Sequence, residues 1–478
     1  MEERAAIPPG LPRLKPTISY WQDPPSDIGC LRSTASLPGK ADYIVIGSGI
    51  SGSCIAYNLL CRQPEANVVL LEARQAVSGA TGRNGGHTKA ASYRSFLDHE
   101  RELGLEEAIK IAKLEHANIV ATHEFAREHG IDCASTECHT VDVVYSKTQF
   151  EVGKQAIERM RQSMGDHPAT QYKIWDADEA KEKLLTPDAC GAFEYYAGSL
   201  SAYQFTTGVL KLALAKGLNL QTTTPGTSLS SEPCSGKTEW TVQTPRGLIT
   251  APQIVLAING YSAHLLPSLQ GAIVPLHGQI CAQRPGLGLP QTGLENTYSF
   301  IHETGYEYMI SRPPGTPDAG TIIIGGGLWR LENNGASRYG ETDDTALEPS
   351  ITRFLRDCTE EYFGPENWGA DHASGRVTKE WSGIMGASAD GLPYVGALPD
   401  TQGLWISAAF NGHGMVWCLK AAEALVIMVE GSETENREIE EWFPRSAMVS
   451  RERLETKFKG RKDLRAPGEA QFGERGKL

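Results

Sequence analysis

Residues 41–88 constrain the fold of this chain more than any other stretch. An apolar run at 43–46 leads into Gly-Ser-Gly-Ile-Ser-Gly at 47–52, a helix-like segment follows, and a second apolar run ends on Glu72. Apolar runs of this length are typical of buried parallel strands. The stretch therefore predicts a strand, a glycine turn, a helix and a second strand, which together begin a Rossmann-like sheet.

The spacing of the three glycines indicates what the turn would bind. Gly47 allows a tight turn, Gly49 lets the backbone approach a pyrophosphate, and Gly52 lets the helix pack closely on the strand. The free N–H groups and the dipole at a helix N-terminus favour an anion. Glu72 follows Gly52 by 20 residues, the place for a carboxylate that accepts from ribose hydroxyls. We predict a dinucleotide site rather than a purely structural turn, and the fingerprint alone leaves NAD and FAD open.

Two further motifs favour FAD. The string Gly-Ala-Thr-Gly-Arg-Asn-Gly-Gly-His at 79–87 is rich in glycine, so its backbone can run against a flat ligand. It resembles a string beside the flavin in the D-amino-acid-oxidase (glycine/sarcosine oxidase-like) superfamily, and most of all in the γ-glutamylputrescine-oxidase-like branch. The second motif, Asn-Gly-His-Gly-Met at 411–415, lies between a strand and a helix, and in this superfamily it faces the flavin pyrimidine. The motifs occur in the family's order over residues 41–430.

The resemblance implies an α/β fold with an additional β-rich lobe. One part would be a discontinuous Rossmann-like FAD-binding domain of the GR2 type, and the other an interleaved antiparallel-sheet substrate domain. We also expect an N-terminal arm and a charged, helical C-terminal tail. The predicted boundaries are 1–40 for the arm, 41–96, 190–272 and 376–430 for the FAD-binding domain, 97–189 and 273–375 for the substrate domain, and 431–478 for the tail.

The resemblance also implies which residues bind FAD. They come from the glycine turn, the end of the second strand, the glycine-rich loop and the C-terminal turn, with two isolated positions in between. Where the family often has a valine against the adenine, this chain has Gly226, which would offer its backbone alone. The predicted set is Gly47, Ser48, Gly49, Ile50, Ser51, Gly52, Glu72, Ala73, Arg74, Thr81, Gly82, Arg83, Asn84, Gly85, Gly86, His87, Gly226, Asn259, Gly412, His413, Gly414 and Met415.

The implied reaction is FAD-dependent oxidation of a C–N bond in a small amine or amino-acid-like substrate. Hydride would pass to flavin N5, and reoxidation by O2 would release H2O2. The candidate catalytic residues are Arg83, His87, Tyr308 and His413. Two alternatives stay open: a flavin-dependent monooxygenase or another tailoring oxidation of a small metabolite, and a non-catalytic flavoprotein. Neither the choice between oxidase and dehydrogenase nor the oligomeric state follows from the sequence.

Several positions depart from the superfamily's pattern. Val416 stands where some relatives carry a lysine for the substrate carboxylate, so that carboxylate would need another cation, with Arg83, Arg94 and Arg312 as candidates. The segment 381–384 has no cysteine to tether FAD. His87 replaces a frequent glutamine, and covalent attachment of FAD through His87 stays open beside a plain packing or hydrogen-bonding role.

Composition narrows the possible partners and locations. A net charge of −13 argues against nucleic acid and anionic membranes, and no apolar run approaches the ~18 residues of a membrane span. Ten scattered cysteines without CxxC pairs are typical of a reducing compartment. We expect the cytosol, since Gly-Lys-Leu at 476–478 only weakly matches a peroxisomal address.

The sequence predicts no metal site. Its histidine-rich segment, 97–129, has the spacing of one or two amphipathic helices. The histidines fall 17, 7 and 6 residues apart, which does not fit the i, i+4 geometry of helix-borne zinc ligands. We interpret them as a solvated helix face: His99, His116, His123 and His129.

Overall fold

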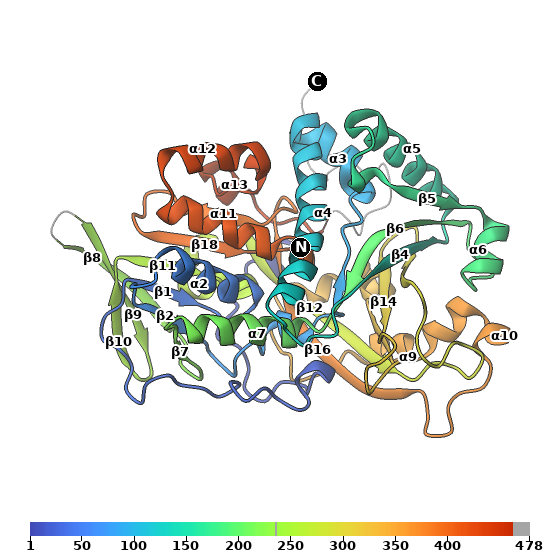
Figure 1. The fold of residues 1–478 in the computed structure, drawn as a ribbon, viewed down its shortest axis with the longest axis horizontal. Helices are drawn as coiled ribbons and strands as arrows, with labels where there is room; N and C mark the ends of the chain where they lie inside the picture. Colours follow the sequence, from blue (N-terminus) through green and yellow to red (C-terminus); the bar gives the residue numbers. More distant parts are fainter. Residues whose placement is uncertain (235–236, 462–478) are drawn as a thin grey trace.

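The computed structural model describes residues 1–234 and 237–461. Figure 1 shows two lobes side by side, each built on a large sheet, with α4 (Leu105–Glu128) running between them. The predicted combination of a Rossmann-like sheet with a mainly antiparallel second sheet is confirmed.

The first lobe contains a six-stranded sheet in the order β17-β18-β11-β1-β2-β7. Its strands are parallel except at the edge, where β17 runs antiparallel to β18. The central strands β1 and β2 are fully buried and consist of apolar and aromatic residues, as expected for strands covered on both faces. The bounds are β1 Tyr43–Ile46, β2 Val68–Leu71, β7 Asn219–Gln221, β11 Gln253–Leu256, β17 Tyr394–Ala397 and β18 Leu404–Ala408.

Successive side chains of β1 serve two different cores. Val45 packs with residues of three helices, whereas Ile44 and Ile46 pack with Trp240 and Val242 of a separate three-stranded sheet. This alternation follows from the two-residue period of a strand. The covering elements are α2 Ile50–Arg62, α7 Ala202–Ala215 and α11 Cys418–Glu430 on one face, and β8 Ser228–Cys234, β9 Lys237–Thr244 and β10 Gly247–Ala251 on the other.

The second lobe contains a nine-stranded sheet in the order β16-β12-β15-β14-β13-β4-β6-β3, with β5 paired to β6. Every pairing is antiparallel except that of β13 with β4. The bounds are β3 His87–Thr88, β4 Thr136–Val144, β5 Tyr172–Trp175, β6 Gly191–Ser199, β12 Ile273–Gln283, β13 Thr297–Ile301, β14 Tyr306–Ser311, β15 Ile322–Gly325 and β16 Val377–Ser388.

The predicted domain boundaries differ from sheet membership in three places, the first being β3, which lies within the predicted FAD-binding segment 41–96 but pairs with β6. The segments 190–272 and 376–430 were predicted for the FAD-binding domain, yet β6 and β16 lie in the nine-stranded sheet. Each strand is followed along the chain by elements of the first lobe, but its hydrogen bonds go to β4 or β12. The division into two domains stays a prediction.

Most remaining helices belong to the second lobe and the two chain ends. The amphipathic segment 97–129 forms two helices that meet at Gly104. The φ of Gly104 is +90°, which is incompatible with a continuous α-helix. The predicted tail contains two short helices up to residue 461, and Gly-Lys-Leu at 476–478 lies outside the described residues. The bounds are α1 Glu2–Ala5, α3 Tyr93–Leu103, α5 Lys147–Met164, α6 Ala177–Lys183, α8 Ser262–Leu265, α9 Pro349–Phe363, α10 Pro365–Trp368, α12 Glu433–Trp442 and α13 Arg451–Glu455.

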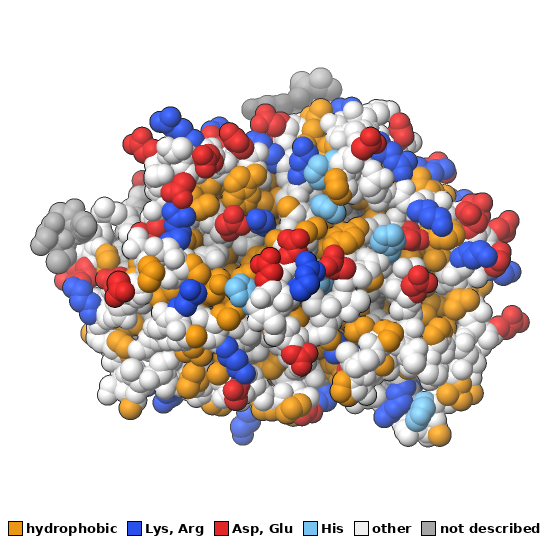
Figure 2. All heavy atoms as spheres, viewed as in Figure 1, with side chains coloured by type: hydrophobic (Ala, Val, Ile, Leu, Met, Phe, Trp, Pro, Cys, Tyr) orange, Lys and Arg blue, Asp and Glu red, His pale blue; other side chains and the backbone are white. Residues whose placement is uncertain are grey.

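One histidine differs from the predicted solvated helix face. His123 is only 1% exposed, and its ring nitrogens lie 2.8 Å from Thr88 Oγ1 and 2.6 Å from Ser135 Oγ. Within the described residues, no three potential ligands are grouped in a way that could hold a metal ion. The same residues include no helix with the length and apolarity to cross a membrane. Acidic and basic side chains are interspersed over the face in Figure 2.

Candidate functional site

The glycine turn after β1 forms a cradle in which Gly47 and Gly52 have no room for a side chain. Gly47 has a φ of +107°, and a Cβ there would lie 2.5 Å from the Ala257 carbonyl oxygen. A Cβ on Gly52 would lie 1.9 Å from the carbonyl oxygen of Gly47. Helix α2 begins directly after Gly49, which has no side chain to occupy the first N–H groups of the helix. The turn is thus open to an anion at the helix N-terminus.

Glu72 is held in a fixed position at the end of β2. The backbone N–H and the hydroxyl of Ser48 donate to its Oε2 at 3.1 and 2.6 Å, and the Arg74 N–H donates to Oε1 at 2.9 Å. Both carboxylate oxygens keep further lone pairs for a ligand. This is the geometry that the predicted ribose contact requires.

The glycine-rich loop connects the cradle to the second sheet. Thr81, in the 3₁₀ turn Ala80–Arg83, accepts from the Ile50 N–H at 3.0 Å. Farther along, a Cβ on Gly85 would lie 2.5 Å from the Tyr308 ring, and one on Gly325 would lie 2.5 Å from the Tyr308 hydroxyl. Tyr308 therefore fits between two glycines, which explains two of the glycines in this region.

The C-terminal turn is held in place by α4. The Asn118 side chain donates to the Met415 carbonyl at 3.1 Å and accepts from the Lys420 N–H at 3.0 Å. One helical turn earlier, the buried Glu115 accepts from Ser92 and, at 3.2 Å, from Trp417. The sequence analysis missed both α4 residues, because nothing near them in the chain indicates contact with residues 415–420.

These elements line one cavity that extends from the first lobe into the second. It is lined by every predicted cofactor residue except Gly52 and Gly82, and also by Tyr308. Those two glycines serve packing: a Cβ on Gly82 would lie 2.2 Å from the Val77 carbonyl oxygen. Tyr306 of β14 also lines the cavity, and further lining residues that were not predicted from the sequence include Lys89, Gln279 and Trp329.

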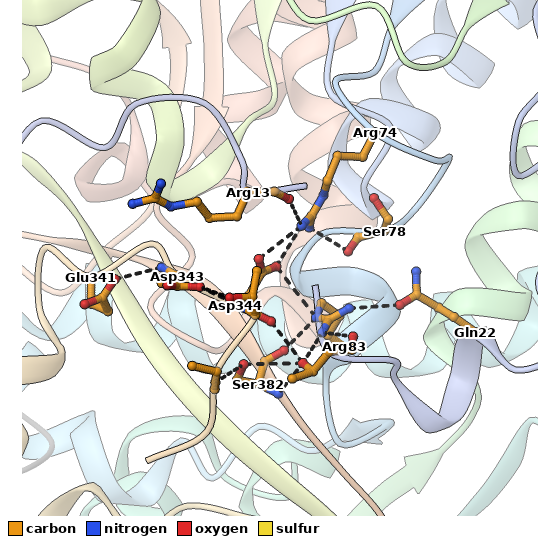
Figure 3. A network of polar contacts seen from close by, with 12 residues as sticks. Arg13, Gln22, Arg74, Ser78, Arg83, Glu341, Asp343, Asp344 and Ser382 are labelled. Carbon is orange, nitrogen blue, oxygen red and sulfur yellow. Dashed lines mark hydrogen bonds and ion pairs between the residues drawn. The ribbon is translucent and has the colours of Figure 1, made fainter. Parts of the chain in front are cut away.

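The guanidinium of Arg83 donates to other segments of the chain. Its Nε donates to the Ser382 carbonyl at 2.6 Å, and its terminal nitrogens donate to Thr17 and, at 3.2 Å, to Gln22. Figure 3 shows Gln22 and Ser382 beside it. Because β16 and the N-terminal arm use its donors, Arg83 anchors the loop; these contacts do not support a role as a substrate cation, which stays a prediction.

Arg312 is also not supported as a substrate cation. It does not line the cavity; its Nε donates to Asp318 at 3.0 Å, and its guanidinium lies over Trp21. Arg94 does line the cavity, with its guanidinium 4.1 Å from the centre of the Tyr306 ring. Arg83 and Arg94 thus both line the cavity, and the donors of Arg83 are used by β16 and the N-terminal arm, so Arg94 is the better candidate for a substrate cation.

His87 and Tyr308 face the cavity as neutral groups. Burial and the charge of Lys89 hold the pKa of His87 well below its usual value, so the imidazole is uncharged at neutral pH. Its Nε2 lies 2.6 Å from Thr297 Oγ1, and its Nδ1 is buried without a partner among the described residues. Burial raises the pKa of Tyr308, which keeps the phenol protonated. His413 also lines the cavity, with its Nδ1 3.4 Å from the Asn411 carbonyl oxygen.

A buried lysine lies beside His87 on the same strand face. Lys89 donates to Asp142 and Ser299, and Asp142 also accepts from the hydroxyls of Tyr93 at 2.9 Å and Tyr195 at 3.0 Å. One signal could have found this lysine, because residues i and i+2 of a strand share a face. Its carboxylate partner is distant in sequence and carries no such signal.

Trp329 forms a wall of the cavity and is held by a buried carboxylate. Its indole N–H donates to Glu307 at 2.7 Å, the Gly327 N–H donates to the same oxygen at 3.0 Å, and the ring stacks on His302 with centroids 4.4 Å apart. Glu307 is fully buried. With its position fixed in this way, the indole is a rigid part of the wall.

The glycine turn of the parallel sheet and the second, mainly antiparallel sheet border the same cavity. This arrangement is that of a two-lobed dinucleotide-binding protein. The chain belongs to the FAD dependent oxidoreductase (DAO) family, whose model matches residues 42–426. FAD is therefore its cofactor, and the predicted superfamily, cofactor and enzyme class are confirmed.

Several proteins share this similarity over most of their length. The chain is 24% identical over 417 residues to a probable oxidoreductase OrdL of Rhizobium meliloti (strain 1021), which covers 84% of this chain and 86% of that protein. It is 21% identical over 388 residues to a gamma-glutamylputrescine oxidoreductase of Escherichia coli (strain K12), covering 80% and 82%. Crystalline glycine oxidase from Geobacillus kaustophilus superimposes with a TM-score of 0.68 at 19% identity, covering 87% of this chain and 99% of that one.

A pH-dependent stability is expected from Glu115. Burial raises its pKa to about 7, against a usual value of 4.5, although Ser92 and Trp417 donate to it. Between these two pH values the folded state keeps a proton that the unfolded state has lost. The free energy of unfolding therefore falls as pH rises through this window, by about 1.4 kcal/mol per unit of pKa shift, and levels off above it.

Glu115→Gln should remove this contribution. The Gln amide can accept from Trp417 and donate to the Ser92 hydroxyl, so the contacts survive without a titrating group. The measurement is the thermal midpoint of the variant minus that of the parent protein, at pH 5.5 and at pH 8. We expect this difference to be more positive at pH 8. Glu124→Gln, on the same helix and half-exposed, is the control. An unchanged difference between the two pH values would contradict the expectation.

Proposed function

We propose that this protein oxidises a C–N bond in a small amine or amino-acid-like substrate, with O2 as the final acceptor and H2O2 as a product. The observation that supports this proposal is the continuity of the dinucleotide cradle with a chamber walled by Tyr306, Tyr308 and Trp329. Bound FAD would supply the redox chemistry by accepting a hydride at N5 from the carbon next to the nitrogen. The names of relatives that act on glycine and gamma-glutamylputrescine point in the same direction.

The charges of the chamber favour a neutral amine. Lys89 and Arg94 line it, whereas the carboxylate among the described lining residues, Glu72, is held in the dinucleotide cradle. Lys89 is paired with Asp142, so the Arg94 guanidinium is the charge that a substrate ammonium would meet on the chamber wall, and this charge lowers the pKa of the ammonium. The chamber would therefore bind the deprotonated form of the amine. We expect kcat/KM to rise with pH and to level off above the pKa of the free substrate amine.

The same charges favour a substrate that also bears an anionic group. Arg94 offers a planar set of donors suited to a carboxylate, and its stacking on Tyr306 restricts its orientation. A polyamine with several ammonium groups would be disfavoured. N-alkyl amino acids and carboxylate-bearing amine conjugates are therefore the proposed substrate class.

Anaerobic bleaching of the flavin absorbance tests the proposal directly. The panel would contain amino acids, N-methyl amino acids, γ-glutamyl amines and polyamines, with N-methylglycine and dimethylamine as a pair that differs in the carboxylate. We expect bleaching by carboxylate-bearing amines, followed by recovery and H2O2 formation on admission of air. Absence of bleaching by every amine would overturn the proposal, and bleaching by NADPH alone would favour the monooxygenase.

Arg94→Met should separate anionic from neutral substrates. A hydrogen bond to a charged group contributes about 1.5–3 kcal/mol, so kcat/KM for a carboxylate-bearing amine should fall roughly tenfold to a hundredfold. The value for a carboxylate-free amine should change little. Arg101→Met, on the same helix but 65% exposed, is the matched control. Equal losses for both substrates would show that Arg94 contributes to packing rather than recognition.

A further inference from the structure

The N-terminal arm lies against the cofactor cavity. Gly10, Leu11 and Pro12 are among the residues that line it, together with the cradle and Glu72. The neighbouring Arg13 carbonyl accepts from Arg74 Nη1 at 3.0 Å, and Arg74 follows Glu72 by two residues. The arm therefore crosses the cavity at the Glu72 end, away from the chamber around Tyr308.

Two sets of bonds fix the arm on either side of this crossing. Before it, Arg4 donates to the Tyr339 carbonyl at 2.7 Å, and Thr342 Oγ1 donates to the Pro9 carbonyl at 3.2 Å. After it, the Thr17 N–H donates to the Asp344 carbonyl at 2.8 Å, and Ser19 Oγ donates to the Gly82 carbonyl at 2.6 Å. Residues 10–12 are thus a short bridge between two anchored segments.

A buried charge cluster holds the second anchor (Figure 3). The Asp344 carboxylate, 1% exposed, accepts from Arg74 Nη1 at 2.9 Å, and Arg83 Nε lies 3.9 Å from it. Two buried guanidinium groups therefore share one buried carboxylate. Burial and Arg74 lower the pKa of Arg83 to about 10, while Asp344 opposes the shift. This excess positive charge borders the cavity, where a diphosphate would balance it.

Two polar groups on the cavity wall also point to a ligand in this cavity. The Tyr261 hydroxyl and His264 Nε2 are buried and have no hydrogen-bond partner among the described residues, and both residues line the cavity. The electrostatic partners of Tyr261 include Asp344, Arg74, Arg83 and Arg13. A ligand that bears hydroxyl and phosphate groups would satisfy these atoms.

We propose that the N-terminal arm is part of the FAD site: residues 10–12 close the cavity over the bound cofactor, and Thr17 with the Arg74–Asp344–Arg83 cluster is the latch that holds them there. FAD then enters and leaves only when this segment lifts. Leu11 and Thr17 act as positioning residues for the cofactor, and neither contributes to the chemistry of the substrate.

The rate of FAD release from the holoenzyme tests this proposal. Leu11→Ser removes an apolar wall of the cavity, and Leu14→Ser changes a neighbouring leucine that is 79% exposed. With an excess of an FAD-specific apoprotein to trap released FAD, we expect roughly tenfold faster release from the first variant, as removal of about half a leucine's buried surface implies, and no change from the second. Thr17→Val, which loosens the latch, should behave like the first.

Amide hydrogen exchange supplies a second measurement that needs no variant. The N–H groups of residues 10–20 should exchange at least tenfold more slowly in the holoenzyme than in the apoprotein. Release rates equal to the parent rate in both Leu11→Ser and Thr17→Val would overturn the proposal, as would exchange at 10–20 that is independent of FAD. Neither measurement uses a substrate, so failure here is distinguishable from failure of the proposed oxidation.

Discussion

Gly52→Ala is expected to yield a protein that purifies without FAD and binds it at least a hundredfold more weakly than the parent. An alanine Cβ would lie 1.9 Å from the Gly47 carbonyl oxygen and 3.2 Å from the Ala257 Cβ. Helix α2 is packed in the core of the first lobe, so it cannot retreat without opening that core. The turn must move instead, which displaces the N–H groups that would hold the pyrophosphate.

The measurement is the ratio of flavin to protein absorbance, followed by fluorescence titration of apoprotein with FAD. Gly39→Ala is the control, because a Cβ there meets nothing within 4 Å and its φ is not positive. Gly49→Ala is a second cradle variant, chosen because it should change the turn without disturbing the packing of the fold. Its Cβ would approach only the Thr81 hydroxyl, at 3.1 Å, and its φ of −64° suits alanine. Normal FAD affinity in both cradle variants would contradict the assignment of this turn.

The cradle was predictable because its determinants are local. The strand, the turn, the helix and Glu72 lie within about 30 residues. The contact of Gly47 with the Ala257 carbonyl oxygen lies outside this stretch. Gly52 packs against Gly47, five positions earlier, so the spacing itself carries the geometry. The same holds for the helices within 97–129, where the periodicity fixes the apolar face and a glycine marks the break.

The predictions differ from the structure where side-chain direction depends on distant segments. Arg83 was predicted to face the substrate, but Thr17 and Ser382, 66 and 299 positions away, provide its acceptors. Lys89 was missed as part of the site because Asp142 lies on another strand. The predicted boundaries differ from sheet membership at β3, β6 and β16 for a related reason: chain order does not determine which sheet a strand joins.

Asp142→Asn is expected to destabilise the apoprotein by about 3–5 kcal/mol, because it leaves the buried Lys89 ammonium without its counterion. Asp142 is fully buried, and burial lowers the pKa of Lys89 while the charge of Asp142 opposes that shift. The Ser299 hydroxyl would remain as an acceptor but carries no charge. Chemical denaturation followed by far-UV circular dichroism measures the loss.

Two further variants turn this expectation into an ordered series. Lys89→Met should cost less than Asp142→Asn, since the remaining carboxylate keeps the hydroxyl donors of Tyr93 and Tyr195. Asp98→Asn breaks an exposed ion pair with Arg101 and should cost under about 1 kcal/mol. The deficit of Asp142→Asn should also shrink as pH rises toward 10, because the folded state can then release the unpaired lysine proton. A cost for Asp142→Asn no larger than that for Asp98→Asn would mean that Lys89 does not depend on this carboxylate.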